Sequence, residues 1–229
     1  MSPAAALPVA LVTGFEAFGG DPVNPSWEIA SRLEGWEIGD ARGSSLAVVR
    51  AVRLPCVFGE ALTALDQALE THRPVAVVAL GLAGSRQDIS VERIAINIDD
   101  ARIPDNRGRQ PVDEAVCPQA PAAYWSSLPI KAIVTALQDA GIAASVSQSA
   151  GTFVCNHVFF GLAHRLATRR PQIRGGFIHV PWPFGQATPG GQAAGLVDLE
   201  MAIEAIRIAL QVTLTFGEGD LRRGAGAID

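Results

Sequence analysis

The sequence predicts an α/β domain built around a largely parallel sheet. Short apolar runs, typical of strands buried on both faces, alternate along the chain with amphipathic segments of helical period. Hydrophobic residues make up 48% of the 229 residues and charged residues 18%, so the chain can bury one sizeable core. Because neither an internal repeat nor a linker interrupts this alternation, we expect a single domain over residues 1–229.

The individual elements follow from local patterns. Apolar runs predict strands at 9–13, 46–54, 75–80, 143–147 and 177–180. Apolar residues at three- and four-residue spacing predict helices at 25–33, 59–71, 130–140 and 198–212, and one more that begins near Cys155. Asn24 and Pro25 mark the start of the first helix as its N-cap and first-turn proline.

Three further segments are less regular. Strict alternation predicts one strand over 91–98, in which Glu92 has the same parity as three isoleucines and its carboxylate therefore starts on the apolar side. The polar, proline-bearing stretch 99–119 predicts a long functional loop or flap. We also expect a Gly/Pro-rich loop at 183–195 and a frayed, flexible tail over 217–229.

Composition excludes several classes of protein. A formal charge of −5 gives no basic footprint for nucleic acid. The three cysteines, Cys56, Cys117 and Cys155, cannot all pair and form neither a CxxC nor a Cys/His zinc pattern, which favours a reducing, cytoplasmic location. The start of the chain lacks the basic region of a signal peptide, and no apolar run reaches the ~18 residues of a membrane span. We therefore expect no membrane partner.

Cys155 is the candidate nucleophile. It lies in the first turn of a predicted helix, directly after the small-residue turn 149–152. Unpaired N–H groups and the positive end of the helix dipole lie at such a position, where they favour thiolate and can lower the cysteine pKa below its free value of about 8.5. A hydrolase with a cysteine nucleophile needs such a site. The alternative is a small buried side chain, since free cysteine is often buried.

A cysteine nucleophile needs a base, and the candidates are His72, His157, His164 and His179. A helix turns His157 about 200° away from Cys155, and His164 lies more than two turns further along. His72 occupies a polar helix end. His179 lies near the C-terminal end of a short apolar strand, the edge where α/β sheets place their sites. A satisfied core histidine on a strand is an equally good interpretation of His179 from these residues alone.

The base in turn needs an orienting carboxylate. The candidates are Glu92, Asp88, Asp99, Asp100 and Asp105. Glu92 is favoured because an acid on an apolar face must be paired, for instance with a histidine N–H, or it costs several kcal/mol. An ion pair between Glu92 and an arginine such as Arg86 explains the same pattern equally well.

The loop after the first strand carries two aromatic residues. Phe15 and Phe18 could form the walls of a small apolar pocket, although ordinary core packing explains them as well. The glycines of this loop fit GxxxxG, but Gly20-Asp21 stands where a phosphate-binding loop needs Lys-Ser/Thr. Asn24 is adequately explained as a helix cap.

Five stretches together resemble the pyroglutamyl peptidase I (pyrrolidone-carboxylate peptidase) family of cysteine peptidases. They are TGFEAFGGDPVNPSWE (13–28), ERIAINIDDARIPDNRG (92–108), PAAYWSSLPIK (121–131), SAGTFVCNHVFFGL (149–162) and RGGFIHVPW (174–182). They occur in the order of the family and are highly specific in combination. The resemblance implies a three-layer α/β/α sandwich with a mostly parallel, mixed sheet. It also implies a homotetramer that removes N-terminal pyroglutamate from peptides without a cofactor or metal.

The resemblance also implies roles for individual residues. It assigns the nucleophile to Cys155, the base to His179 and the orienting acid to Glu92. The substrate-binding residues that it implies are Phe15, Phe18 and Asn24 in the ring pocket and Arg102 near the site. One departure is Leu82, in Gly81-Leu82-Ala83-Gly84, where members usually read Gly-Gln-Ala-Gly. If the glutamine side chain holds the lactam, leucine weakens recognition; if only its backbone does, leucine is harmless.

Two other classes of function compete with a peptidase. One is a non-catalytic binding protein that kept the scaffold, and the complete set of Cys155, His179 and Glu92 argues against it. The other is a nucleoside- or phosphate-handling enzyme on a similar sandwich. The missing phosphate-loop lysine and the lack of a basic patch weaken that second interpretation.

Overall fold

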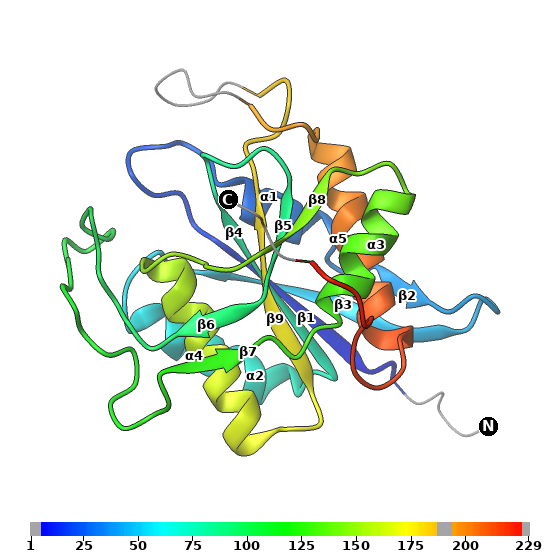
Figure 1. Cartoon of the computed structure of the whole chain (residues 1–229), viewed down its shortest axis with the longest axis horizontal. Helices are drawn as coiled ribbons and strands as arrows, with labels where there is room; N and C mark the ends of the chain where they lie inside the picture. Colours follow the sequence, from blue (N-terminus) through cyan, green and yellow to red (C-terminus); the bar gives the residue numbers. More distant parts are fainter. Residues whose placement is uncertain (1–5, 187–193, 226–229) are drawn as a thin grey trace.

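A central sheet lies between two layers of helices in the computed structural model, which describes residues 6–186 and 194–225 (Figure 1). Its strands are β1 (Val9–Phe15), β2 (Glu37–Gly39), β3 (Ser45–Leu54), β4 (Ala76–Leu82), β5 (Ile89–Glu92), β8 (Ala144–Ser147) and β9 (Arg174–Val180). A separate two-stranded ribbon consists of β6 (Ile94–Ile96) and β7 (Ala123–Trp125). The helices are α1 (Pro25–Arg32), α2 (Glu60–His72), α3 (Ile130–Asp139), α4 (Val154–Arg169) and α5 (Leu199–Thr215).

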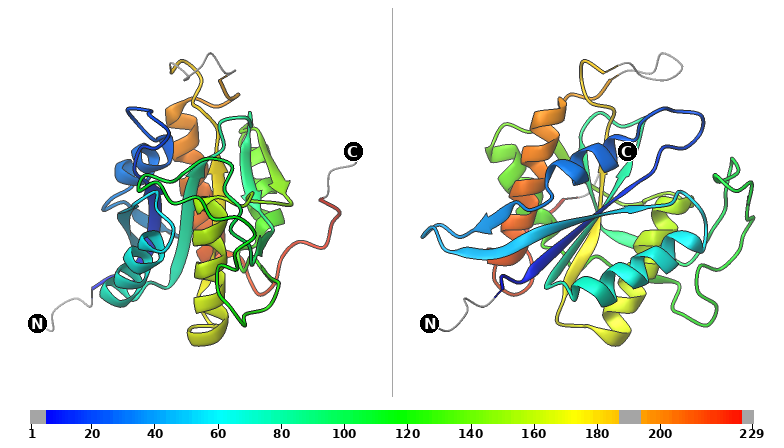
Figure 2. Two further views of the ribbon diagram at one scale, coloured as in Figure 1. Left: turned by 90° about the vertical axis from the view of Figure 1, so that its left-hand side faces the viewer. Right: turned by 180° about the vertical axis from the view of Figure 1, so that it is seen from behind.

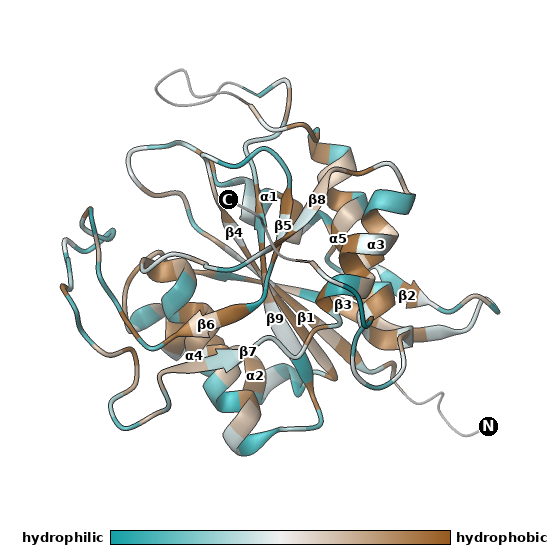
Figure 3. Ribbon diagram, viewed as in Figure 1, coloured by the Kyte–Doolittle hydropathy of each residue, from teal (hydrophilic) through white to brown (hydrophobic). Residues whose placement is uncertain are grey.

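The seven strands follow the order β2-β3-β1-β4-β9-β5-β8. The four strands β3, β1, β4 and β9 run parallel to one another. At one edge, β2 pairs antiparallel with β3; on the other side, β5 pairs antiparallel with β9, and β8 pairs parallel with β5. The central strands are predominantly apolar (Figure 3), as strands covered on both faces must be. The predicted α/β fold with a mostly parallel, mixed sheet is confirmed.

The two faces of the sheet bury separate parts of the core. One layer contains α1, α3 and α5 and the other contains α2 and α4, as two further views show (Figure 2). Side chains alternate along each strand. On β4, Val78 and Leu80 therefore pack with the first layer, whereas Val77 and Ala79 pack with the second. The predicted three-layer arrangement is thus present, and parity along a strand tells which layer a side chain meets.

The predicted strand over 91–98 is wrong. The chain leaves the large sheet after Glu92 and enters the small ribbon at Ile94, with Arg93 at the break. Within the ribbon it is Ala95 that is buried, while Ile94 and Ile96 are half-buried. Glu92 is fully buried, but it does not share a strand face with the isoleucines, contrary to what the alternation suggested. It ends β5 on the sheet face that α4 covers.

The long segment between β6 and β7, predicted as a functional loop, runs along the edge of the molecule (Figure 1). It contains no regular element beyond one bridge, Asp99 with Glu114. Asp105 fastens the loop by accepting the backbone N–H groups of Phe58, Arg107 and Arg109. The loop is therefore anchored to the start of α2, and whether it also moves as a flap stays a prediction.

The C-terminal residues that we expected to fray make specific contacts as far as residue 225. The Asp220 carboxylate accepts the backbone N–H groups of Lys131 and Ala132 at the start of α3. At residue 225, the Ala225 carbonyl accepts a hydrogen bond from the Arg93 guanidinium at 2.6 Å. The rest of the tail, 226–229, and part of the expected 183–195 loop, 187–193, lie outside the described residues. In the two described stretches, no helix is both long and apolar enough to cross a membrane.

Candidate active site

Glu92 and His179 form a buried pair on one face of the sheet. His179 lies on β9 opposite Ser90 of β5, and Glu92 is two residues further along β5, so both side chains point to the same face. The Nδ1 atom of His179 lies 2.7 Å from Oε1 of Glu92. Glu92 is 0% exposed and His179 only 4%. The structure thus brings together the base and the acid that the sequence predicted.

Cys155 reaches the same place from the helix layer. Gly81 on β4 is the strand neighbour of His179. A Cβ atom built on Gly81 would lie 2.8 Å from the Cys155 sulfur and 2.7 Å from Cζ of Phe177. The sulfur therefore packs over the backbone of Gly81, the strand neighbour of His179. No side chain caps the start of α4, which leaves backbone N–H groups available around Cys155.

The Glu92 contact determines the tautomer of the imidazole. Burial by itself would raise the pKa of Glu92, but the hydrogen bond and charge of His179 and the charge of Arg86 hold it below the ordinary value of 4.5. Glu92 is therefore an ionised acceptor, and Nδ1 of His179 carries the proton. Burial lowers the pKa of His179, against the opposing effect of Glu92, so the resting imidazole is neutral with Nε2 as a free acceptor.

The protonation state of Cys155 differs from the sequence expectation. Part of the side chain remains exposed, yet the dense surroundings of the sulfur raise its pKa above the ordinary value. The neighbouring Cys56 and Glu92 act in the same direction, and Arg86 opposes them. The helix start therefore does not make a resting thiolate here, because removing a charge from water outweighs the local dipole.

The other histidines have different partners. His157 points its Nδ1 at Oδ2 of Asp99, 2.8 Å away, and its Nε2 accepts the backbone N–H of Gly59. His164 lies 2.8 Å from the hydroxyl of Tyr124. His157 therefore joins α4 to the long loop and to the start of α2, and it has no free ring nitrogen for catalysis. This agrees with the rejection of His157 as the base from its helical position.

Known proteins resemble this chain over most of its length. The family whose sequence pattern matches the chain, over residues 9–215, is pyroglutamyl peptidase. The chain is 53% identical over 205 residues to the pyrrolidone-carboxylate peptidase of Enterobacter sp. (strain 638), covering 90% of each chain. It is 50% identical over 221 residues to that of Yersinia pestis (strain Pestoides F), covering 95% of this chain and 98% of the relative. The chain belongs to the pyroglutamyl peptidase family.

Solved structures of pyroglutamyl peptidases have the same fold. The Bacillus amyloliquefaciens pyroglutamyl peptidase I superposes with a TM-score of 0.86 at 44% identity, covering 93% of this chain and 100% of that chain. The pyrrolidone carboxyl peptidase of Thermococcus litoralis superposes with a TM-score of 0.85 at 41% identity, covering 92% and 94%. The resemblance inferred from motifs is confirmed over most of the chain, and the roles of individual residues stay predictions.

The predicted ring-pocket residues of the pyroglutamyl peptidase do not all meet. Phe18 and Arg102 line a cleft of about 330 Å³ together with Phe153 and the turn that leads to Cys155. The Phe18 and Phe153 ring centres are 6.1 Å apart. Phe58 packs edge-on against Phe153 at 5.4 Å. This cleft lies at the start of α4 and includes Phe153, two residues before the candidate nucleophile.

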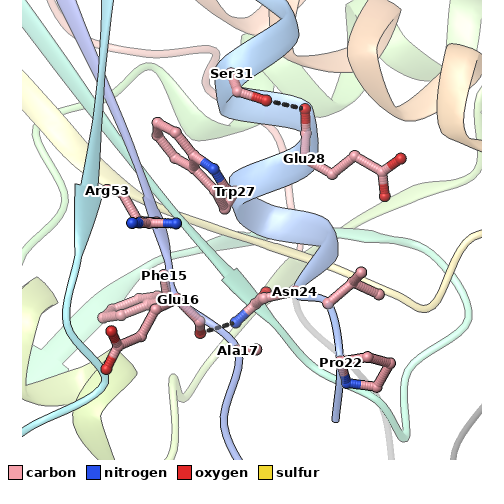
Figure 4. A pocket seen from close by; sticks show the side chains of 10 residues that line it. Phe15, Glu16, Ala17, Pro22, Asn24, Trp27, Glu28, Ser31 and Arg53 are labelled. Atoms are coloured by element: carbon pink, nitrogen blue, oxygen red, sulfur yellow. Dashed lines mark hydrogen bonds between the residues drawn. The ribbon is translucent and has the colours of Figure 1, made fainter.

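Phe15 and Asn24 occupy a different place. Phe15 is 2% exposed and packs in the core with its ring centre 6.4 Å from that of Phe177. The Asn24 amide donates to the Glu16 carbonyl, and its oxygen accepts the backbone N–H of Ser26 as the cap of α1. Both residues border a cavity of about 380 Å³ beside α1, where Asn24 is turned towards Glu16 (Figure 4). The core and cap interpretations thus fit these two side chains.

Leu82, the departure from the family pattern, ends β4. The Cβ position of Gly81 faces Phe177 and Cys155, so alternation directs the Leu82 side chain to the opposite face of the sheet. This direction favours a backbone contact over a side-chain contact with substrate at this position.

Sequence reasoning missed Phe153 and the way the long loop supports it. Phe153 is the N-cap residue of α4, a position that helical periodicity does not score. Next to it, the Thr152 hydroxyl donates to the Asp100 carbonyl at 2.7 Å, and the Asp100 N–H donates back to the Thr152 carbonyl. The signal available in the sequence was an aromatic residue placed between a small-residue turn and Cys155.

Proposed function

We propose that Cys155, His179 and Glu92 carry out the hydrolysis that defines this family. As a pyroglutamyl peptidase, the chain removes an N-terminal pyroglutamyl residue from peptides. One arrangement supports the three roles. The free Cys155 sulfur packs on Gly81, the strand neighbour of His179, and Nδ1 of His179 is held by the buried carboxylate of Glu92. A nucleophile, a base and an orienting acid need these relative positions.

The first step transfers the thiol proton as the sulfur attacks. Nε2 of His179 accepts the proton while the Cys155 sulfur bonds to the carbonyl carbon that joins the pyrrolidone ring to the next residue. A buried thiol with a raised pKa stays neutral until the substrate carbonyl can take up negative charge. Uncapped N–H groups at the start of α4 would stabilise that oxyanion, by about 2.7–4 kcal/mol per donor in comparable enzymes.

The second step releases the shortened peptide. The His179 imidazolium, stabilised by the Glu92 carboxylate, donates its Nε2 proton to the leaving amine as the C–N bond breaks. A thioester between the pyroglutamyl group and Cys155 remains. Neutral His179 then takes a proton from water, whose oxygen attacks the thioester and releases pyroglutamate and the thiol.

Specificity for the lactam follows from the walls of the cleft. Phe18 and Phe153 form an apolar slot that suits a flat, uncharged ring. An ordinary peptide presents an ammonium group there, and its desolvation is costly. Arg102 and Asp100 both lie in the wall of the same cleft, so their opposite charges offset each other and the exclusion of an ammonium rests on its desolvation.

We also propose that the chain is one domain, acts in the cytoplasm and forms a homotetramer. The single family match over residues 9–215 and the continuous sheet support one domain. Three free cysteines, Cys56, Cys117 and Cys155, support a reducing compartment. The tetramer rests on the family resemblance, and size-exclusion chromatography with light scattering tests it.

The decisive assay compares fluorogenic amides. We expect hydrolysis of a pyroglutamyl amide, its loss after alkylation with iodoacetamide, and no comparable hydrolysis of the prolyl amide, which has the ring but carries an ammonium. Cys155→Ser should fold normally and fall below about a tenth of wild-type turnover, a loss of at least ~1.4 kcal/mol. A folded protein without activity on the pyroglutamyl amide would favour a non-catalytic binding protein instead.

A further inference from the structure

One oxygen of Glu92 serves two donors. Oε1 accepts the His179 Nδ1–H at 2.7 Å and a guanidinium N–H of Arg86 at 2.6 Å. The second terminal nitrogen of Arg86 donates to the Ser149 carbonyl at 2.7 Å. The two interpretations of Glu92 from the sequence, a triad acid and an ion pair with Arg86, are therefore both present at once. Among the described residues, Oε2 of Glu92 makes no hydrogen bond of good geometry. The nearby Ser147 hydroxyl helps to lower the pKa of Glu92, but Arg86 and His179 make the two direct hydrogen bonds to its carboxylate.

We propose that Arg86 is a positioning residue of the catalytic site, which clamps Glu92 to the turn that carries the nucleophile. Ser149 opens the small-residue turn that leads into α4 and Cys155. The guanidinium is a rigid planar fork, so its two bonds fix the carboxylate and this turn relative to each other. The proposal rests on Cys155, His179 and Glu92 as the catalytic set, and it adds a residue that touches none of the reacting atoms.

The charge of Arg86 gives the clamp a second effect. The ionisable groups around His179 are Glu92 on β5, Arg86 in the β4–β5 loop and Cys155 on α4. Glu92 raises the pKa of His179, and Arg86 lowers it. Without Arg86, the full charge of Glu92 would favour the imidazolium, which cannot act as a base. Arg86 therefore extends to lower pH the range over which the resting imidazole of His179 is neutral.

Three variants separate the fork from the charge. Arg86→Gln removes both, and Arg86→Lys keeps the charge but has no fork. Arg170→Gln is the matched control, because Arg170 also has a largely buried side chain and binds a single carboxylate, that of Glu70 at 2.8 Å, at the far end of α4. The measurements are kcat and KM for a pyroglutamyl amide over a pH series, with a thermal melt of each variant.

We expect Arg86→Gln to lower kcat by roughly tenfold or more, with KM within about twofold, and to move the acid limb of the profile to higher pH. Arg86→Lys should restore the position of the acid limb but only part of kcat. Arg170→Gln should retain the wild-type profile. A purely structural role would change the melt without moving the acid limb.

Two results would overturn the clamp. One is a folded Arg86→Gln protein with wild-type kcat and an unmoved acid limb. The other is an Arg86→Lys protein with the kcat of the wild type, because lysine keeps the charge but lacks the fork. This second result needs no comparison with Arg86→Gln and therefore decides the matter even if the glutamine variant does not fold. Loss of the catalytic assignment itself would appear separately, as retained turnover in Cys155→Ser with an intact Arg86.

Discussion

Replacing Gly81 with alanine places a methyl group between the sheet and the candidate nucleophile. The new Cβ would lie 2.8 Å from the Cys155 sulfur and 2.7 Å from Cζ of Phe177, whereas carbon atoms in contact are normally ~3.5–4.0 Å apart. Phe177 is fully buried and cannot move aside. The sulfur must therefore shift away from residue 81 by a sizeable fraction of an ångström, which changes its position relative to His179 on the neighbouring strand.

The expected magnitude has two parts. Overpacking a core position costs about 1–3 kcal/mol, which for a domain of this size corresponds to a fall in Tm of roughly 2–12 °C. A misplacement of about 1 Å in a catalytic group can cost about 100-fold in rate. We therefore expect kcat/KM for a pyroglutamyl amide to fall by roughly 10- to 100-fold in protein that is still folded at the assay temperature.

The matched control is Gly161→Ala, later in α4. Its new Cβ would press on the side chain of Leu62 and would not touch the catalytic residues. This variant should lose stability and keep most of its kcat/KM. A folded Gly81→Ala enzyme with at least half of the wild-type kcat/KM would refute the placement of the Cys155 sulfur on Gly81.

Three other predictions follow from the site. Cys56→Ala/Cys117→Ala should keep activity within about threefold, because both residues lie in loops and neither occupies a helix start with a candidate base. Inactivity of the folded double variant would reassign the roles. Leu82→Gln should change kcat/KM by less than about threefold, since the side chain leaves the site face; a larger gain, within the 3- to 100-fold range of a recovered hydrogen bond, would show a side-chain contact. A pH series should show kcat/KM falling on the acid side below 6.5, because His179 must be neutral and its pKa is lowered. The free energy of unfolding should also fall below pH 6.5, because His179 binds a proton there in the unfolded state before it does so in the folded state. It should fall further below pH 4.5, where Glu92 is protonated in the unfolded state before it is protonated in the folded state. An acid limb of kcat/KM above pH 6.5 would contradict the assignment.

The sequence predicted the long strands and helices well because their periodicity reflects burial on a known face. It missed β2 and β7, which are three residues each and therefore too short for a period. It joined β5 to β6 because alternation continues through Arg93, although the chain changes sheets there. Which strands pair is a tertiary property, and local pattern does not encode it.

In the candidate site, too, local patterns predicted some features and missed those that depend on tertiary packing. Cys155 and His179 were found from local position, at a helix start and a strand end. Glu92 was chosen through a parity argument that the break at Arg93 removes, although the structure does place its carboxylate against His179. The direction of the Cys155 pKa depends on how much protein surrounds the sulfur, which the helix position alone does not reveal. Phe153 was missed because residues outside a helical stripe are not scored by periodicity.

Covalent labelling tests the central claim most directly. A halomethyl ketone that carries the pyroglutamyl group should inactivate the enzyme, and peptide mapping by mass spectrometry should find the label on Cys155 alone, with labelling slowed by excess pyroglutamyl amide. The account predicts this because Cys155 is the free cysteine that lies beside His179 and its carboxylate. Inactivation with the label on Cys56 or Cys117, and Cys155 unmodified, would contradict it.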